Sequence, residues 1–148
     1  MADIYSKRKR SELMSRVRSA GNKSTELRLI AVMRAAHITG WRRHQNLPGR
    51  PDFVFRKHRL ALFVDGCFWH ACKRCAQRSR MPATNRQFWA NKISGNCRRD
   101  RWVNRTLRSE SWRVLRIWEH ELKKPNRCLA RLLRALSPSA RRRFPSTQ

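Results

Sequence analysis

The sequence predicts an α/β fold in one domain, and three observations lead to this prediction. Apolar segments with the pattern of strands alternate with segments that have the 3.6-residue period of helices. Their order along the chain is helix, three strands, helix, strand, helix, which indicates a sheet packed against helices. The 148 residues suit a single compact domain, and the chain contains no internal repeat.

The domain begins with a helix that we predict over residues 24–37. A serine and a threonine at its start are suitable N-caps, and Leu27 and Ile30 begin an apolar stripe with helical period. The preceding residues 1–23 are polar and basic, with little apolar periodicity. We therefore expect an N-terminal arm that stays mobile until it meets a partner.

Three strands follow the first helix. A weak pattern predicts the first strand over residues 41–44, and a turn-rich segment then leads into a hairpin of residues 52–55 and 60–64. The second hairpin strand is almost entirely apolar, which is typical of a strand buried on both faces of a sheet.

The remainder of the domain contains helices and one more strand. We predict helices over residues 85–93 and 98–108, a strand over residues 112–118, and a helix over residues 127–136. Residues 138–148 are rich in proline, serine and arginine, which predicts a disordered tail. The folded domain therefore covers residues 24–137.

The charge of the chain indicates a polyanionic partner. Lysine and arginine number 36 against 9 aspartate and glutamate residues, for a formal net charge of +27. Such a charge favours nucleic acid, bound through its phosphates. No segment approaches the roughly 20 apolar residues of a membrane-spanning helix. Because a ribosomal or architectural protein would have a similar charge, the reaction has to be read from the scarce acids.

Two acids stand at the ends of the predicted hairpin. Asp52 begins one strand and Asp65 follows the other, so their side chains are expected to meet at one end of the sheet. Carboxylates in a phosphate-binding protein favour a magnesium site for phosphodiester hydrolysis. Each acid alone would be better explained as a turn residue. Together, in a chain with few acids, they favour a nuclease.

Three cysteines, Cys67, Cys72 and Cys75, have a spacing that suits one tetrahedral zinc ion. The fourth ligand is either His70 or His120. Disulfide bridges are less favoured, because the N-terminus has no apolar signal core and the chain has five cysteines, an odd number.

Five ordered blocks carry a family resemblance. They are Leu47-Pro48-Gly49-Arg50-Pro51-Asp52-Phe53-Val54, Gly66-Cys67-Phe68-Trp69-His70, Pro82-Ala83-Thr84 with Phe88-Trp89, Asn96 with Arg99-Asp100, and Trp112-Arg113-Val114 with Trp118-Glu119. In this order and spacing they resemble the very-short-patch (Vsr) mismatch repair endonucleases, over residues 8–125. The second block, at this distance from the first, is the most specific feature.

The resemblance implies a restriction-endonuclease-like fold, with a mixed central sheet flanked by helices and a structural zinc site. It also implies a magnesium-dependent endonuclease that nicks double-stranded DNA on the 5′ side of the thymine in a T·G mismatch. Such mismatches form when 5-methylcytosine deaminates, and the nick starts very short patch repair. We expect a monomer of the bacterial cytoplasm, associated with the nucleoid and not with membranes, with mismatch-repair proteins as further partners.

The resemblance assigns roles to the acids and to one histidine. Asp52 matches the metal-binding aspartate of the family, and His70 matches its catalytic histidine, the general base that activates water. Glu26 and Asp100 match acidic residues around the active site. For Glu26, a favourable charge in the first turn of a helix is the alternative interpretation.

The aromatic residues Phe68, Trp69 and Trp89 match those that the family inserts into the duplex beside the mismatch. Insertion unstacks a base step at a cost of roughly a few kcal/mol, and less where the pair is already mismatched. Packing in the protein core is the alternative for each of them. We favour that alternative most for the neighbouring Phe88.

For zinc, the resemblance implies the ligands Cys67, Cys72, Cys75 and His120. His70 is then free for catalysis, and the zinc would be structural and distinct from the catalytic magnesium. The family has cysteine and histidine exchanged at two of these positions, and zinc accepts both.

The chain departs from the family pattern at Val64 and Asp65, where threonine and histidine are usual. Val64 can still offer its backbone carbonyl to magnesium. Asp65 either replaces the histidine or is a direct carboxylate ligand, and the sequence leaves both open. Two other functions also stay open: a non-catalytic zinc-containing protein that binds nucleic acid, and a nuclease with a different DNA substrate.

Overall fold

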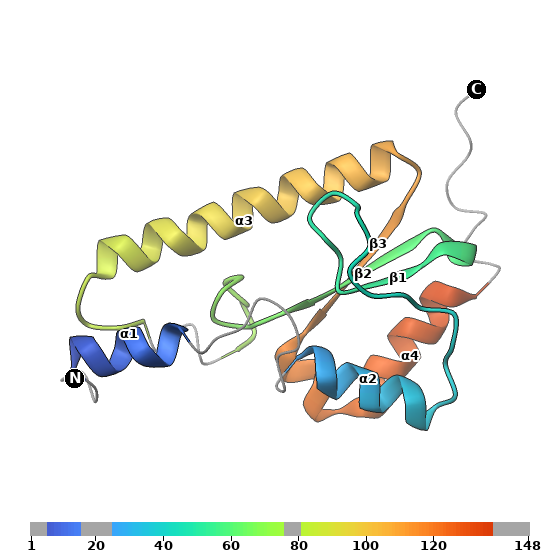
Figure 1. Cartoon of the computed structure of the whole chain (residues 1–148), viewed down its shortest axis with the longest axis horizontal. Helices are drawn as coiled ribbons and strands as arrows, with labels where there is room; N and C mark the ends of the chain where they lie inside the picture. The colour runs from blue at the N-terminus through green and yellow to red at the C-terminus, as the bar shows by residue number, and fades with distance from the viewer. Residues whose placement is uncertain (1–5, 16–24, 76–80, 138–148) are drawn as a thin grey trace.

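The computed structural model describes residues 6–15, 25–75 and 81–137, and it contains a small mixed sheet with helices on both faces (Figure 1). The elements in chain order are α1 (Lys7–Ser15), α2 (Glu26–Ala35), β1 (Phe53–Phe55), η1 (Arg56–His58), β2 (Leu60–Asp65), α3 (Arg86–Ser109), β3 (Arg113–Trp118), η3 (Glu119–Lys123) and α4 (Pro125–Leu136). The predicted α/β class is confirmed.

The sheet has the order β1-β2-β3, with β2 in the centre. β1 and β2 form the predicted antiparallel hairpin, in which Phe53 is opposite Leu62. β2 and β3 are parallel, with Phe63 opposite Arg116 and Asp65 opposite Trp118. β2 is almost entirely buried, as its apolar sequence predicts for a central strand.

The two faces of the sheet pack against different helices (Figure 1). On one face, α2 and α4 enclose the larger core, which includes Leu29, Met33 and Leu132. On the other face, α3 covers a smaller apolar cluster in which Val103 and Leu107 pack against Ala61 and Phe63. The carboxyl end of β2 lies just beyond this smaller cluster, where the side chains become polar.

Two helices predicted over residues 85–93 and 98–108 are one continuous helix, α3. The interval between the two predicted helices contains Gly95, and a glycine costs a helix about 1 kcal/mol relative to alanine. Two contacts beside this glycine hold the helix in place. Asn96 Nδ2 donates to the Trp69 carbonyl at 2.9 Å, and the Cys97 thiol contacts the His70 carbonyl at 3.6 Å.

The strand predicted over residues 41–44 is wrong as a strand, because only one residue pairs with the sheet. Arg42 and Val54 exchange two backbone hydrogen bonds of 2.9 and 2.8 Å. His44 then has a positive φ of 53°, which ends the extended conformation.

The ends of the chain differ from the prediction in part. The basic N-terminal segment contains the helix α1, which the weak periodicity did not indicate. Residues 1–5 and 16–24 of the expected arm, and the expected tail over residues 138–148, lie outside the described residues. Within the described residues, no helix has both the length and the apolar composition needed to cross a membrane.

Candidate active site and metal centre

A cavity of about 710 Å³ opens at the carboxyl end of β2. The elements bring five predicted catalytic residues to its wall: Glu26 from the start of α2, Asp52 before β1, Asp65 at the end of β2, His70 from the following loop, and Asp100 from α3. The hairpin geometry explains why Asp52 and Asp65 meet, because the start of β1 and the end of β2 are adjacent in an antiparallel pair.

Asp52 is the carboxylate with the most perturbed proton affinity in this cavity. Burial raises its pKa to about 6; the backbone N–H of Val64, which donates to its Oδ2 at 2.7 Å, opposes this shift. The charges of Glu26 and Asp65 raise the pKa further, and Arg116 lowers it. A carboxylate that is disfavoured by burial and by neighbouring acids suits a cation, which would compensate its charge.

Glu26 is buried and forms an ion pair with Arg43. It therefore does more than complement the dipole of α2, although it stands in the first turn of that helix. Arg43 was not identified from the sequence, since it follows a weakly patterned segment among many other arginines.

His70 is held by a short contact with Asp100, in which Nδ1 lies 2.6 Å from Oδ2. Burial opposes the charged form of His70, but the hydrogen bond to Asp100 and the charge of Asp65 outweigh it and raise its pKa. For Asp100, burial is likewise outweighed by His70 and Arg116, so its pKa is lowered. With Nδ1–H donating to Asp100, the neutral ring has its lone pair on Nε2, as a general base requires.

Asp65 is buried and bonded to Arg116, whose Nη1 donates to both of its carboxylate oxygens at 2.8 and 3.0 Å. Burial raises the pKa of Asp65, and Arg116 opposes that shift. Arg116 is a site residue that the sequence reasoning missed. Its signal was an arginine inside an otherwise mostly apolar predicted strand.

A second cluster lies on the loop after β2 and on η3. Cys67 Sγ lies 3.2 Å and Cys72 Sγ 3.5 Å from Nδ1 of His120, and these three residues could hold a metal ion. Burial raises the pKa of Cys67 to about 12, and the neighbouring thiols of Cys75 and Cys72 raise it further. Thiols packed around an imidazole fit zinc, which stabilises the thiolate form.

The cysteine spacing alone left open whether His70 or His120 lies beside the cysteines, and the structure distinguishes the two. His120 lies among the cysteines, and His70 lies with Asp65 and Asp100. The cysteine cluster and the acidic cluster therefore share one loop but contain different residues.

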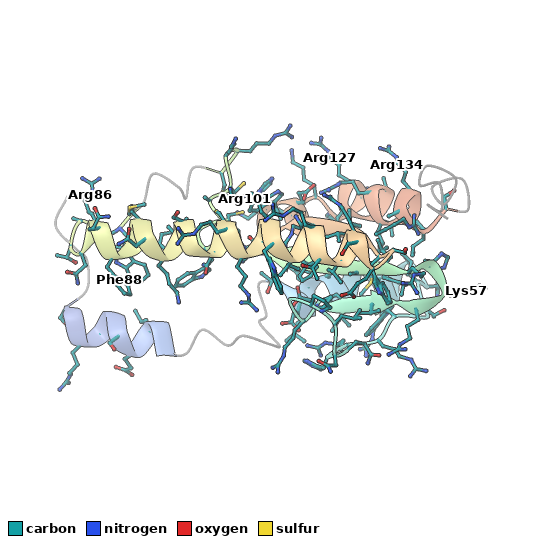
Figure 2. All side chains as sticks on the ribbon, turned by 90° about the horizontal axis from the view of Figure 1, so that it is seen from above. Lys57, Arg86, Phe88, Arg101, Arg127 and Arg134 are labelled. Atoms are coloured by element: carbon teal, nitrogen blue, oxygen red, sulfur yellow. The ribbon has the colours of Figure 1, made fainter. Side chains whose placement is uncertain are left out.

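Four aromatic rings form a contiguous group beside the loop. Trp89 contacts Phe68, Trp69 and Phe88, with ring centroids 5.8, 5.9 and 5.3 Å apart. Trp89 is buried, whereas Phe88 is 60% exposed near the start of α3 (Figure 2). The preference for core packing at Phe88 was therefore wrong. Phe88 lies in the first turn of α3, where only one side of the helix faces the loop, and most of its ring is exposed to solvent.

The sequence profile of the family described as DNA mismatch endonuclease Vsr matches residues 2–77. The type II nicking enzyme V.XorIIP of Xanthomonas oryzae pv. oryzae is 37% identical over 142 residues, which cover 94% of this chain and 100% of the relative.

Two further relatives are similar over different extents. The DNA mismatch endonuclease Vsr of Escherichia coli (strain K12) is 37% identical over 123 residues, or 83% of this chain and 77% of the relative. The type II nicking enzyme V.NaeI of Lentzea aerocolonigenes is 49% identical over 72 residues, which cover 49% of this chain and 42% of the relative.

Proposed function

Because this chain belongs to the family of the DNA mismatch endonuclease Vsr, we propose that it nicks duplex DNA on the 5′ side of the thymine in a T·G mismatch. The observation that carries the proposal is the cavity at the end of β2, where a histidine oriented by Asp100 faces the same space as the carboxylate Asp52. A base and a metal-binding acid in one cavity are what phosphodiester hydrolysis requires.

In the proposed reaction, Asp52 and the backbone carbonyl of Val64 would hold magnesium. Magnesium would supply charge that stabilises the phosphoryl group and the leaving oxygen. His70 accepts a proton from the attacking water at Nε2, while Asp100 keeps Nδ1 protonated and the ring oriented. Glu26 lines the same cavity, and its charge raises the pKa of Asp52.

The second metal in the proposal is a structural zinc bound by Cys67, Cys72, Cys75 and His120. It would join the loop after β2 to η3 and thereby fix the backbone on both sides of His70. Phe68, Trp69 and Trp89 form one packed group on this loop and on α3, and we propose that this group enters the base stack at the mismatch.

A strand-nicking assay tests the proposal. Purified, zinc-loaded protein is incubated with a labelled duplex that contains one T·G mismatch, and with a matched duplex of the same sequence. We expect a magnesium-dependent nick 5′ of the mispaired thymine, and none in the matched duplex. The proposal fails if no T·G context is nicked, and cutting of the matched duplex would instead support a nuclease with another substrate.

The variants Asp52→Asn and His70→Ala distinguish catalysis from binding. We expect both to lose nicking while still binding the mismatched duplex, because neither supplies the positive charge that contacts phosphates. If both variants nick as well as the natural protein, the cavity is not the catalytic site. A chain that binds DNA but never nicks it would favour the non-catalytic zinc-containing protein.

A further inference from the structure

Arg116 lies on the face of the sheet that packs against α3. It lies on β3 directly opposite Phe63 of β2, and α3 covers this face. Its guanidinium carbon is 4.4 Å from the centre of the Phe63 ring, and its side chain is only 16% exposed. A charged group at such a position needs partners, because unpaired burial of a charge is costly.

All three guanidinium nitrogens of Arg116 have a partner. Nη1 donates to both oxygens of Asp65, Nε donates to Oδ1 of Asn104 at 3.0 Å, and Nη2 is 3.3 Å from Oδ1 of Asp100. Asp100 and Asn104 are four residues apart and therefore share one face of α3. Arg116 thus connects β2, β3 and α3 through a single planar group.

The partners of Arg116 surround a position that would otherwise suit a cation. The ligand atoms of Asp65, His70 and Asp100 all lie within 4.8 Å of one another, an arrangement that could hold a metal ion. The Arg116 guanidinium already contacts both of these carboxylates. Asp100 divides its oxygens between two partners, with Oδ2 toward His70 and Oδ1 toward Arg116.

The acids of the cavity differ in whether they have an ion-pair partner. Glu26 is paired with Arg43, and Asp65 and Asp100 are paired with Arg116, but among the described residues Asp52 has no ion-pair partner. Within residues 6–15, 25–75 and 81–137, the one hydrogen bond to Asp52 comes from the backbone N–H of Val64.

We propose that the Arg116 guanidinium takes the place of a cation between Asp65 and Asp100, so that Asp65 is a positioning residue and not a magnesium ligand. Arg116 fixes one oxygen of Asp100, and the other oxygen is thereby aimed at Nδ1 of His70. Among the described side chains of the cavity, Asp52 is then the only one that would bind magnesium. This inference rests on the proposed function, and it identifies Arg116 as a second positioning residue for the histidine.

The first test measures metal binding without DNA. Mn²⁺ is titrated into zinc-loaded protein and followed by its electron paramagnetic resonance signal. We expect Asp52→Asn to abolish Mn²⁺ binding and Asp65→Asn to leave the dissociation constant unchanged. If Asp65→Asn weakens Mn²⁺ binding as much as Asp52→Asn does, Asp65 is a ligand and the inference is overturned. This result does not depend on whether the protein nicks DNA.

The second test separates positioning from DNA binding. At saturating DNA, we expect Arg116→Met to slow single-turnover nicking about 10–100-fold, as loss of a supporting contact typically does. The Mg²⁺ concentration that gives half the maximal rate should not change. Arg113→Met is the matched control, because it removes the same charge from the other end of β3, where Nη2 of Arg113 donates to the His58 carbonyl. The control should nick at the natural rate, and an equal rate for Arg116→Met would overturn the inference.

A variant that retains the charge guards against loss of folding. Arg116→Lys keeps a cation beside Asp65 but lacks the planar fork that reaches Asp100 and Asn104 at the same time. We expect its nicking rate to be closer to that of Arg116→Met than to that of the natural protein, with its melting temperature preserved. We also expect the ¹⁵N spectrum of its His70 ring to show a smaller fraction protonated at Nδ1. A natural nicking rate and a natural ring spectrum would contradict the positioning role.

Discussion

At the scale of single residues, the candidate site is a set of acids that differ in how their charge is compensated. Asp100 is compensated by His70 and Arg116, whereas Asp52 has only a backbone donor among the described residues. The sequence predicted which acids would meet, since both hairpin acids lie at strand ends. It could not predict their ion pairs, because any of 36 basic residues was available as a partner.

The Asp100→Asn variant should change the pH dependence of both stability and nicking. His70 has a raised pKa, so its stabilising contribution is full below about pH 6.5 and is lost as the pH rises through its folded value. Asp100 has a lowered pKa, so its contribution is present above about pH 3.9 and is lost in acid. We therefore expect the loss of melting temperature in Asp100→Asn to be larger at pH 5.5 than at pH 8.5.

The nicking profile provides the matching measurement for Asp100→Asn. If His70 is the proposed general base, the rate should rise as its imidazolium loses a proton. Without the carboxylate of Asp100, the pKa of His70 falls, so the acid limb of the profile should move to lower pH while the maximum rate decreases. An acid limb that stays in place would show that His70 is not the group that limits the rate.

Asp52→Asn should make the protein more stable while abolishing nicking. The pKa of Asp52 is raised to about 6, so its ionisation destabilises the folded state as the pH rises above its unfolded value. A shift of this size corresponds to about 2–3 kcal/mol at pH 8 without magnesium. Asparagine can still accept the Val64 N–H bond, and urea unfolding at pH 8 without added magnesium would measure the gain. A variant less stable than the natural protein would contradict this view of Asp52.

At the scale of elements, apolar pattern predicted the hairpin, β3 and α4 well, because each has a buried face that sets its period. The break predicted within α3 was wrong, because the helix continues through Gly95. Tertiary contacts by Asn96 and Cys97, with carbonyl groups 27 residues away in the chain, support the helix there. Such contacts are invisible to a local reading.

Two glycines should respond in opposite ways to alanine substitution. An added Cβ at Gly95 meets no atom within 4 Å, so Gly95→Ala should stabilise the protein by about 0.5–1 kcal/mol. At Gly49, φ is +76° and an added Cβ would lie 2.5 Å from Cγ1 of Val103, so Gly49→Ala should destabilise it. Urea unfolding of both variants measures the difference, and a loss of stability in Gly95→Ala would show that α3 needs flexibility there.

The cysteine cluster gives a prediction for the loop between β2 and α3. We expect one zinc per chain in the purified protein, and Cys72→Ser should lose that zinc together with nicking activity. Cys128→Ala is the matched control, because Cys128 is a buried core residue of α4 and does not belong to the cluster of Cys67, Cys72 and His120. Metal analysis by mass spectrometry decides the point, and full zinc content in Cys72→Ser would exclude this cysteine as a ligand.

At the scale of the whole molecule, the arginines divide into those that extend into solvent and those that are paired with acids. Arg101 on α3 and Arg127 and Arg134 on α4 extend outward from the surface (Figure 2), whereas Arg43 and Arg116 are partly buried against acids. The chain therefore uses arginine in two ways, for long-range attraction outside and for charge compensation inside.

Binding to a matched duplex should depend steeply on salt. If six to ten phosphates are contacted, the affinity falls by about 10³–10⁵ between 50 and 200 mM salt. The preference for a T·G duplex over a matched one should change less, because aromatic stacking at the mismatch releases no counterions. Fluorescence anisotropy at several salt concentrations measures both quantities, and a preference that collapses with salt would contradict recognition by stacking.

The parallel pairing of β2 with β3 has a consequence for how the protein is made. Asp65 and Arg116 are 51 residues apart in the chain, and Cys67 and His120 are 53 apart. During synthesis the ribosome therefore makes Asp52, His70 and Asp100 before it makes β3 and His120. A nascent or prematurely terminated chain that ends before β3 has the acids and the histidine but cannot align them. Under the proposed function, the ability to nick DNA thus arises only late in translation, when the last strand docks.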